Sequence, residues 1–316
     1  MTFDPLNVCA TETSGILRRN DGWLADPDNA RLLAGQIAPG FQPDSRFDLS
    51  FFSGRTIVAG TVVPVYVGGN GTSGDAAAWP QSDIQAIDGA LAQAFRDPDL
   101  ESVIAQYLPA GTSLAVAASQ SLTHQAASLQ QSDVEAMVQS AFPAGSLSGQ
   151  PASTLFCLML SPGTRLFAAD GSDSYNGLGG YHGSVSDGTT TVYYAVGVYS
   201  ETLDGVTNGI AAFDQPWKNV VATFYHEINE WRTDPDVERA QGASVSGILG
   251  WYSQQYGEIG DIPITEAGPD LSEVFVEVPL TGGGGTVPVQ LMYSNFDHGP
   301  ARVTSAPAGS ALPAAG

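Results

Sequence analysis

The hydrophobic and polar positions between residues 216 and 232 repeat with the period of an α-helix. Apolar side chains recur at i, i+3, i+4 and i+7 spacing, at Trp217, Val220, Val221, Phe224, Ile228 and Trp231. Polar side chains fall on the opposite side, at Asn219, Thr223, His226 and Glu230. Pro216 suits a first helical turn, and Pro235 disfavours helical geometry at Asp234. The pattern predicts a helix from about residue 216 to about 232, with His226 well inside it.

Elsewhere the chain alternates between strand and helix patterns. Apolar, valine-rich runs predict strands at 56–67, 155–160, 190–199 and 287–293. Helical spacing after Pro80 predicts a helix with an apolar stripe of Ile84, Ile87, Leu91 and Phe95. Ser132 and Glu135 form the pattern of a capping box, which predicts a further helix there. This alternation indicates an α/β or α+β layered domain.

Composition divides the chain into three parts. Residues 1–48 are irregular and rich in Asp and Pro, and we interpret them as an N-terminal arm. Residues 49–300 carry the strand and helix patterns and form the predicted domain. Residues 301–316 are small residues and proline, which predicts a disordered tail.

The charge of the chain excludes several classes of partner. With 33 acidic and 11 basic residues, its formal charge of −22 argues against binding nucleic acid or an anionic membrane surface. No segment reaches the roughly 18 apolar residues of a membrane helix, and residues 1–5 lack the regions of a signal peptide. We expect a soluble protein that is either cytoplasmic or a mature form after removal of an export signal. The oligomeric state is not predicted.

The strongest chemical signal is the run His226-Glu227-Ile228-Asn229-Glu230 in the predicted helix. In the related pattern H-E-x-x-H, side chains at i and i+4 bind zinc from one face of a helix, and the intervening glutamate activates a water. Here Glu230 takes the place of the second histidine. The alternative is a solvated face, on which His226 and Glu230 form a pair that contributes a few tenths of a kcal/mol.

Two later segments strengthen the metal hypothesis. Gly250-Trp251-Tyr252 and Gly257-Glu258-Ile259-Gly260-Asp261 follow the helix, where a zinc enzyme would supply a third protein ligand. A carboxylate from Glu258 or Asp261 could complete that set.

These segments resemble the phosphate-induced protein (Exordium-like) family. The resemblance is carried by HEINEWRTDP, GWYSQQYGEIGD and GGGGTVPVQLMYSNF, and more loosely by GYHGS and SLTHQAASLQQSDVEAMV, so it spans residues 50–300 approximately. Members look like zincin relatives with an H-E-x-x-E helix. The resemblance implies a zincin-like mixed sheet packed on a metal-bearing active-site helix, and it implies secretion. This chain lacks the cysteines that accompany these motifs in plant members.

We therefore expect a metal-dependent hydrolase, most specifically a peptidase that acts on a peptide or protein. His226, Glu230 and Glu258 would bind the metal, with Asp261 as a fourth ligand or an orienting carboxylate. Glu227 would be the general base. Zinc is the expected ion, although manganese and calcium also suit a site of one imidazole and several carboxylates.

Other side chains are candidates for contacts with substrate. By resemblance, His182 in GYHGS has a substrate-side or ligand role, whereas its default interpretation is a turn histidine bonded to backbone. Tyr252 could polarise the substrate, and weaker candidates for that role are Tyr256, Tyr293 and His298. The alternative for the tyrosines is half-buried packing with a satisfied hydroxyl.

Two other functions fit less well. A binding or signalling protein could retain the fold and the metal without turnover. A nucleotide-dependent enzyme would use the glycine-rich run 69–74, but the next helix begins too late, near Pro80, for its N-terminus to meet a pyrophosphate.

Overall fold

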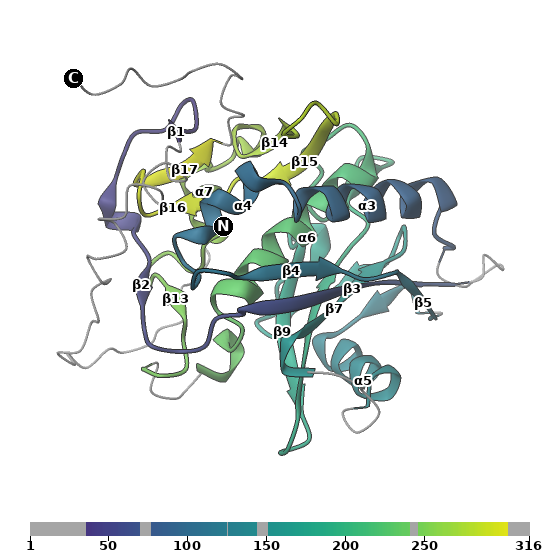
Figure 1. Cartoon of the computed structure of the whole chain (residues 1–316). Coiled ribbons are helices and arrows are strands. Elements are labelled where there is room, and N and C mark those ends of the chain that lie inside the picture. The colour runs from purple at the N-terminus through teal and green to yellow at the C-terminus, as the bar shows by residue number, and fades with distance from the viewer. Residues whose placement is uncertain (1–35, 70–76, 125, 144–150, 241–245, 303–316) are drawn as a thin grey trace, which may run out of the picture.

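A six-stranded mixed sheet forms the centre of the protein (Figure 1). The structure is a computed structural model that describes residues 36–69, 77–124, 126–143, 151–240 and 246–302. The sheet has the order β4-β3-β7-β10-β9, and β5 also pairs with β3. All pairings are parallel except the one between β10 and β9, so β9 is an antiparallel edge strand. The strands are β3 (Ala59–Gly68), β4 (Ser113–Val116), β5 (Gln120–Thr123), β7 (Thr154–Leu160), β9 (Gly180–Ser186) and β10 (Thr191–Gly197).

Helices cover both faces of this sheet. The described residues contain α3 (Gln81–Ala94), α4 (Pro98–Ala105), α5 (Gln131–Ala141), α6 (Pro216–Thr233) and α7 (Asp261–Ala267). Alternate side chains of β7 point to opposite faces, as strand geometry requires. Leu155, Cys157 and Met159 join the core beneath α3, α4 and α6. Phe156, Leu158 and Leu160 join a second core beneath α5.

α6 is enclosed on all sides from Asn219 to Thr233. The sheet strands β7, β9 and β10 pack on one side of it, and β15 (Thr286–Gln290) packs on another. β15 pairs with β14 (Phe275–Pro279) as an antiparallel hairpin. The polar side of α6 is therefore buried, so the solvated-face alternative is wrong.

Short strands complete the fold around this centre. They are β1 (Gln36–Ile37), β2 (Ser50–Phe51), β6 (Ser128–Leu129), β8 (Arg165–Leu166), β11 (Glu201–Leu203), β12 (Val206–Asn208), β13 (Trp251–Tyr252), β16 (Tyr293–Ser294) and β17 (Gly299–Arg302). β1 pairs with β17, so residues from both the expected arm and the expected tail take part in the sheet structure. Residues 1–35 of the expected arm and 303–316 of the expected tail lie outside the described residues. No helix in the described ranges has the length and apolar character of a membrane span.

The expected elements agree with the structure except at specific points. The helices at 216–232 and after Pro80 are confirmed as α6 and α3, and the four strand runs contain β3, β7, β10 and β15. The capping box was placed wrongly, because Gln130 and Asp133 form it rather than Ser132 and Glu135. His182 lies inside β9 instead of on a turn. Most of the 69–74 run lies outside the described residues.

A buried ion pair joins α4 to the C-terminal half of α6. Arg232 is 1% exposed, and its guanidinium donates to Glu101 Oε1 at 2.8 Å and to Oε2 at 2.7 Å. Arg232 also donates to Asn229 Oδ1 at 3.1 Å. Because a guanidinium without its partner is costly inside a protein, this pair holds α4 against the helix that carries the candidate site.

Glu101→Ala should destabilise the protein by about 3–5 kcal/mol, because it leaves the Arg232 charge buried and unpaired. The Glu101 side chain is 29% exposed, so water can reach the vacated space and we expect the lower end of that range. Chemical denaturation measures the change in unfolding free energy. The double variant Glu101→Ala/Arg232→Met should recover most of the loss, and a Glu101→Ala variant as stable as the wild type would contradict the role of this pair.

Candidate metal centre

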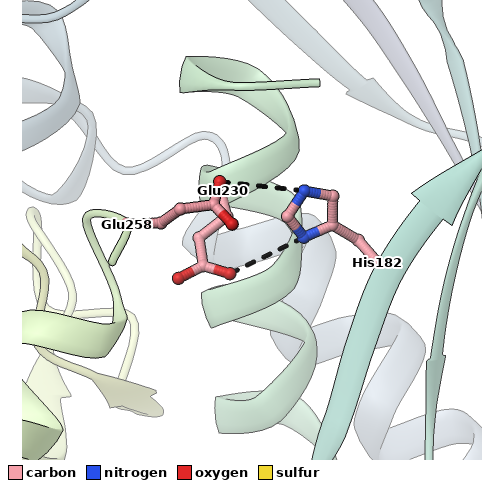
Figure 2. A group of neighbouring side chains, drawn as sticks. All are labelled: His182, Glu230 and Glu258. Atoms are coloured by element: carbon pink, nitrogen blue, oxygen red, sulfur yellow. Dashed lines mark ion pairs between the residues drawn. The ribbon is translucent and has the colours of Figure 1, made fainter. Parts of the chain in front are cut away.

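Three elements bring six acidic and imidazole side chains together. α6 supplies His226, Glu227 and Glu230, since residues four apart on a helix share a face. β9 supplies His182 from the sheet edge. Glu258 and Asp261 come from the loop after β13 and from the start of α7. Figure 2 shows His182, Glu230 and Glu258 pointing toward one another from strand, helix and loop.

The inner part of the centre consists of His182, Glu230 and Glu258, all less than a tenth exposed. His182 Nδ1 lies 3.6 Å from Glu230 Oε2, and His182 Nε2 lies 3.8 Å from Glu258 Oε1 (Figure 2). Glu227 Oε2 is 3.4 Å from His182 Nδ1. The inner group is thus enclosed in the core between the sheet and α6.

The outer part consists of His226, Asp261 and the same Glu230. His226 Nε2 lies 3.0 Å from Glu230 Oε1 and 3.9 Å from Asp261 Oδ1. The Asp261 side chain is 48% exposed, whereas that of His226 is 11% exposed. Solvent therefore reaches the centre from the side of Asp261.

The donor atoms of both groups are suited to a divalent ion. In each group one nitrogen and two carboxylate oxygens lie within 4.8 Å of one another. Four ligands that bind zinc tetrahedrally at about 2.0–2.2 Å lie roughly 3.3 Å apart. Glu258 Oε1 is also a buried oxygen without a hydrogen-bond partner, which is costly unless a cation binds it. The buried His182, Glu230 and Glu258 group could hold a metal ion.

Hydrogen bonds from the surrounding residues select the tautomer of each imidazole. The Gln290 amide donates to Gly260 O at 2.7 Å and to Leu291 O at 3.0 Å, so its Oε1 is the atom that faces His226 Nδ1. His226 therefore carries a proton on Nδ1, which leaves Nε2, beside Glu230, as the nitrogen that could bind a metal ion. The Asp234 carbonyl, which can only accept a hydrogen bond, lies 3.4 Å from His182 Nε2, the nitrogen that also lies 3.8 Å from Glu258 Oε1.

Two glycines allow the loop to approach the helix. Gly257 has a φ of +87°, and a Cβ there would lie 2.2 Å from Asp261 Oδ2, the oxygen that accepts the Glu258 N–H. A Cβ on Gly260 would lie 2.4 Å from His226 Nδ1. Glycine is thus required both for the conformation of the loop and for its contact with the imidazole.

The electrostatics of the centre favour cations. Burial alone would lower the pKa of His226, but Glu230, Glu227 and Asp261 outweigh it and raise that pKa from 6.5 to about 10. Burial would likewise raise the pKa of Glu230, yet the charges of His226 and His182 lower it to about 2. Burial, followed by repulsion from Glu230, raises the pKa of Glu258 well above its usual value. In the absence of a metal, protons on the imidazoles and on Glu258 balance the carboxylates.

Of the residues that the sequence suggested as metal ligands, His226, Glu230 and Asp261 form one group, whereas Glu258 groups with Glu230 and His182. His182 lies among the candidate ligands, and Glu227 lies beside it. Tyr252 is 8% exposed, and burial followed by repulsion from Glu258 raises its pKa.

The weaker candidates take part in other contacts, which supports the packing interpretation. Tyr293 donates to Asp44 O and to Asp48 Oδ1, and His298 pairs with the Asp48 carboxylate. Tyr256 packs its ring against Phe47.

Sequence reasoning missed Gln290 and the Asp234 carbonyl. Gln290 is 64 residues from His226 in the chain, and no local pattern connects the two. The expected strand 287–293 includes Gln290. Whether the Gln290 side chain faces α6, however, depends on the tertiary structure.

Comparisons with protein-family models, with curated proteins and with solved structures found no match. The family resemblance of the H-E-x-x-E helix therefore stays a prediction. The mixed sheet, the buried helix and the cluster of imidazoles and carboxylates are properties of the structure itself.

Gly260→Ala should weaken zinc binding by roughly 10- to 100-fold, the usual effect of disturbing a residue that orients a ligand. The new methyl group would displace the His226 ring, whereas the backbone of Gly260, at φ −87°, accepts alanine. Competition with a chromophoric chelator measures the affinity. Gly89→Ala in α3 is the matched control, since nothing lies within 4 Å of the added Cβ. Equal zinc affinity in the two variants would contradict the assigned position of His226.

The metal-free protein should lose thermal stability as the pH rises from 6.5 toward 10. A pKa that is raised in the folded state adds stability below the unfolded value of 6.5, and this is lost as the pH passes the folded value of about 10. Melting temperatures measured in chelator across that range test the expectation. Excess zinc should reduce the decline, because the ion replaces the proton on His226. A melting temperature that rises with pH in chelator would contradict the assignment.

Proposed function

We propose that the protein is a zinc-dependent hydrolase with a zincin-like active-site helix, and that it cleaves peptide bonds. One observation carries the proposal: Glu227 and Glu230 of α6 lie 3.4 Å and 3.6 Å from His182 Nδ1, and Glu230 also lies 3.0 Å from His226 Nε2. The centre also includes Glu258 and Asp261, which supply oxygen ligands from a separate loop. Manganese or calcium could replace zinc, because each group has one nitrogen and two oxygens.

In this proposal each side chain has a defined task. A bound divalent ion supplies Lewis acidity and lowers the pKa of a water molecule. Glu227 would accept a proton from the attacking water and would pass it to the leaving amine. Gln290 holds His226, and the Asp234 carbonyl holds His182. Tyr252, kept neutral by its raised pKa, donates a hydrogen bond to the substrate carbonyl.

The edge strand β9 supports a polypeptide as the substrate. β9 ends the order of the central sheet, and it carries His182 beside the centre. Edge strands offer unpaired backbone donors and acceptors to an extended peptide. A cavity of about 520 Å³ follows this edge and is lined by Ser184, Ser186, Thr189, Glu238 and Arg239 among others. Glu238 Oε2 accepts the Ser184 N–H at 2.9 Å, so a substrate strand would replace this contact.

A binding protein that retains the metal without turnover is the second candidate. The enclosure of the centre favours it, because only Asp261 among the six side chains is substantially exposed. The cavity along β9 is not lined by Asp261. A binding function would need the ion to brace the loop of Glu258 but would not need Glu227 as a base.

Two substitutions in one helical turn separate the functions. Glu227→Gln keeps the size of the side chain but removes the base, so a hydrolase should retain its zinc and lose roughly 10²- to 10⁴-fold in rate. Glu230→Ala removes a ligand oxygen, and zinc should leave or bind far more weakly. Elemental analysis and cleavage of a mixed peptide library by the zinc-loaded protein provide the measurements.

The hydrolase proposal fails if the zinc-loaded wild type cleaves nothing in the library, and the binding function is then favoured. Equal loss of zinc in both variants would make Glu227 a ligand instead of the base.

A further inference from the structure

We propose that the centre binds two divalent ions bridged by Glu230, an inner ion held by His182 and Glu258 and an outer ion held by His226 and Asp261. The inference rests on the proposed function only in requiring metal at this centre. It differs from the sequence-based expectation of a single ion held by His226, Glu230 and Glu258, with Asp261 as a fourth ligand or an orienting carboxylate and His182 in a substrate-side or ligand role.

The two oxygens of Glu230 face different partners. Oε1 lies 3.0 Å from His226 Nε2, and Oε2 lies 3.6 Å from His182 Nδ1. The Gly260 N–H donates to Oε1 at 3.2 Å and helps to fix the plane of the carboxylate. A carboxylate that binds one ion through each oxygen suits the separation of roughly 3.5–4 Å found in two-metal enzymes.

The remaining ligand atoms divide into two sets. Within the described residues, the candidate ligands form two groups of three that share Glu230, with atoms inside each group no more than 4.8 Å apart. They do not form one group of five. The ligands of a single ion, bound at about 2.0–2.2 Å, cannot lie more than roughly 4.4 Å apart. Two positions on either side of Glu230 therefore use all five side chains, whereas one position would leave ligands without an ion.

Hydrogen bonds with neighbouring residues orient the two imidazoles toward these positions independently. Gln290 accepts the proton of His226 Nδ1 and directs Nε2 toward Glu230 Oε1. His182 Nδ1 lies 3.6 Å from Glu230 Oε2, and its Nε2 lies 3.4 Å from the Asp234 carbonyl and 3.8 Å from Glu258 Oε1. Metal-binding histidines commonly have such an acceptor behind them, and here each group has its own.

The formal charge of the centre matches two ions. Glu227, Glu230, Glu258 and Asp261 carry four negative charges, and two divalent ions carry four positive charges. In the described part of the chain, ion pairs to these carboxylates come only from His182 and His226.

The two positions differ in depth, which suggests different tasks. His182 and Glu258, which belong to the inner position alone, are each less than a tenth exposed. Asp261 opens the outer position to solvent with its 48% exposed side chain. We expect the inner ion to bind more tightly and to organise Glu230, and the outer ion to retain the coordination positions for water and substrate.

Counting bound ions tests the proposal. Protein stripped with chelator is titrated with Zn²⁺ by calorimetry, and bound zinc is measured by elemental analysis after removal of free ion. We expect two equivalents in the wild type. Glu258→Gln and Asp261→Asn should each retain one equivalent, because each conservative change removes one oxygen ligand from one position only.

A second measurement needs no variant. Two Mn²⁺ ions that share a carboxylate are magnetically coupled, so the paramagnetic resonance spectrum of wild type loaded with two Mn²⁺ should differ from that with one. The matched control is Gly89→Ala, which should behave as the wild type.

The possible results distinguish the two-ion site from the hydrolase proposal. One equivalent in the wild type, without magnetic coupling, would overturn the two-ion site and leave the hydrolase proposal intact. Two equivalents that persist in both ligand variants would place the second ion elsewhere and also overturn it. No bound metal at all would overturn both proposals. Peptide cleavage is scored separately, so an inactive protein with two bridged ions would contradict only the hydrolase.

Discussion

The burial of the polar side of α6 is the constraint on which the rest of the structure depends. From Asn219 to Thr233 every residue of the helix is buried, including His226, Glu227 and Glu230. Ionised carboxylates in a protein interior need opposite charges or hydrogen-bond donors, since their transfer from water is otherwise prohibitive. Arg232 has its own partner in Glu101 on α4. In the described structure the ion-pair partners of the carboxylates at the centre are imidazoles, and the buried His182, Glu230 and Glu258 group could hold a metal ion.

Three parts of the surrounding fold contribute residues that lie beside this helix. The sheet presents β9, whose residue His182 faces the centre, while the β14–β15 hairpin presents Gln290 from another side. The loop after β13 closes on the helix through two glycines, which allow the backbone to approach His226 and Asp261. These elements are far apart in sequence, and the helix is their common contact. The central sheet thus supports a centre whose side chains come mostly from α6 and from the segment that contains Glu258 and Asp261.

Periodicity predicted the parts of the fold that depend on local pattern. The apolar stripe of α6, together with Pro216 and Pro235, predicted its bounds to within one residue, and apolar, valine-rich runs located β3 and β7. The same reasoning missed α7, which has only seven residues, and it placed His182 on a turn because the glycines around it suggested one. Glycines in β9 instead permit close packing: a Cβ on Gly183 would lie 2.6 Å from the Glu238 carboxylate.

The ligands were only partly predictable for a related reason. His226 and Glu230 are four residues apart on one helix, and Glu258 and Asp261 follow in a short motif, so local spacing identified all four. How they divide around Glu230 depends on which oxygen faces which imidazole, and that depends on tertiary contacts of Gln290 and Asp234. No pattern in one sequence contains this information.

X-ray absorption at the zinc edge, on protein loaded with zinc and freed of excess ion, tests most directly whether metal compensates the buried carboxylates. The account predicts nitrogen and oxygen ligands at about 2.0–2.2 Å, with the outer-shell scattering of imidazole rings. A spectrum of zinc coordinated by water alone, or zinc that does not remain with the folded protein, would contradict it.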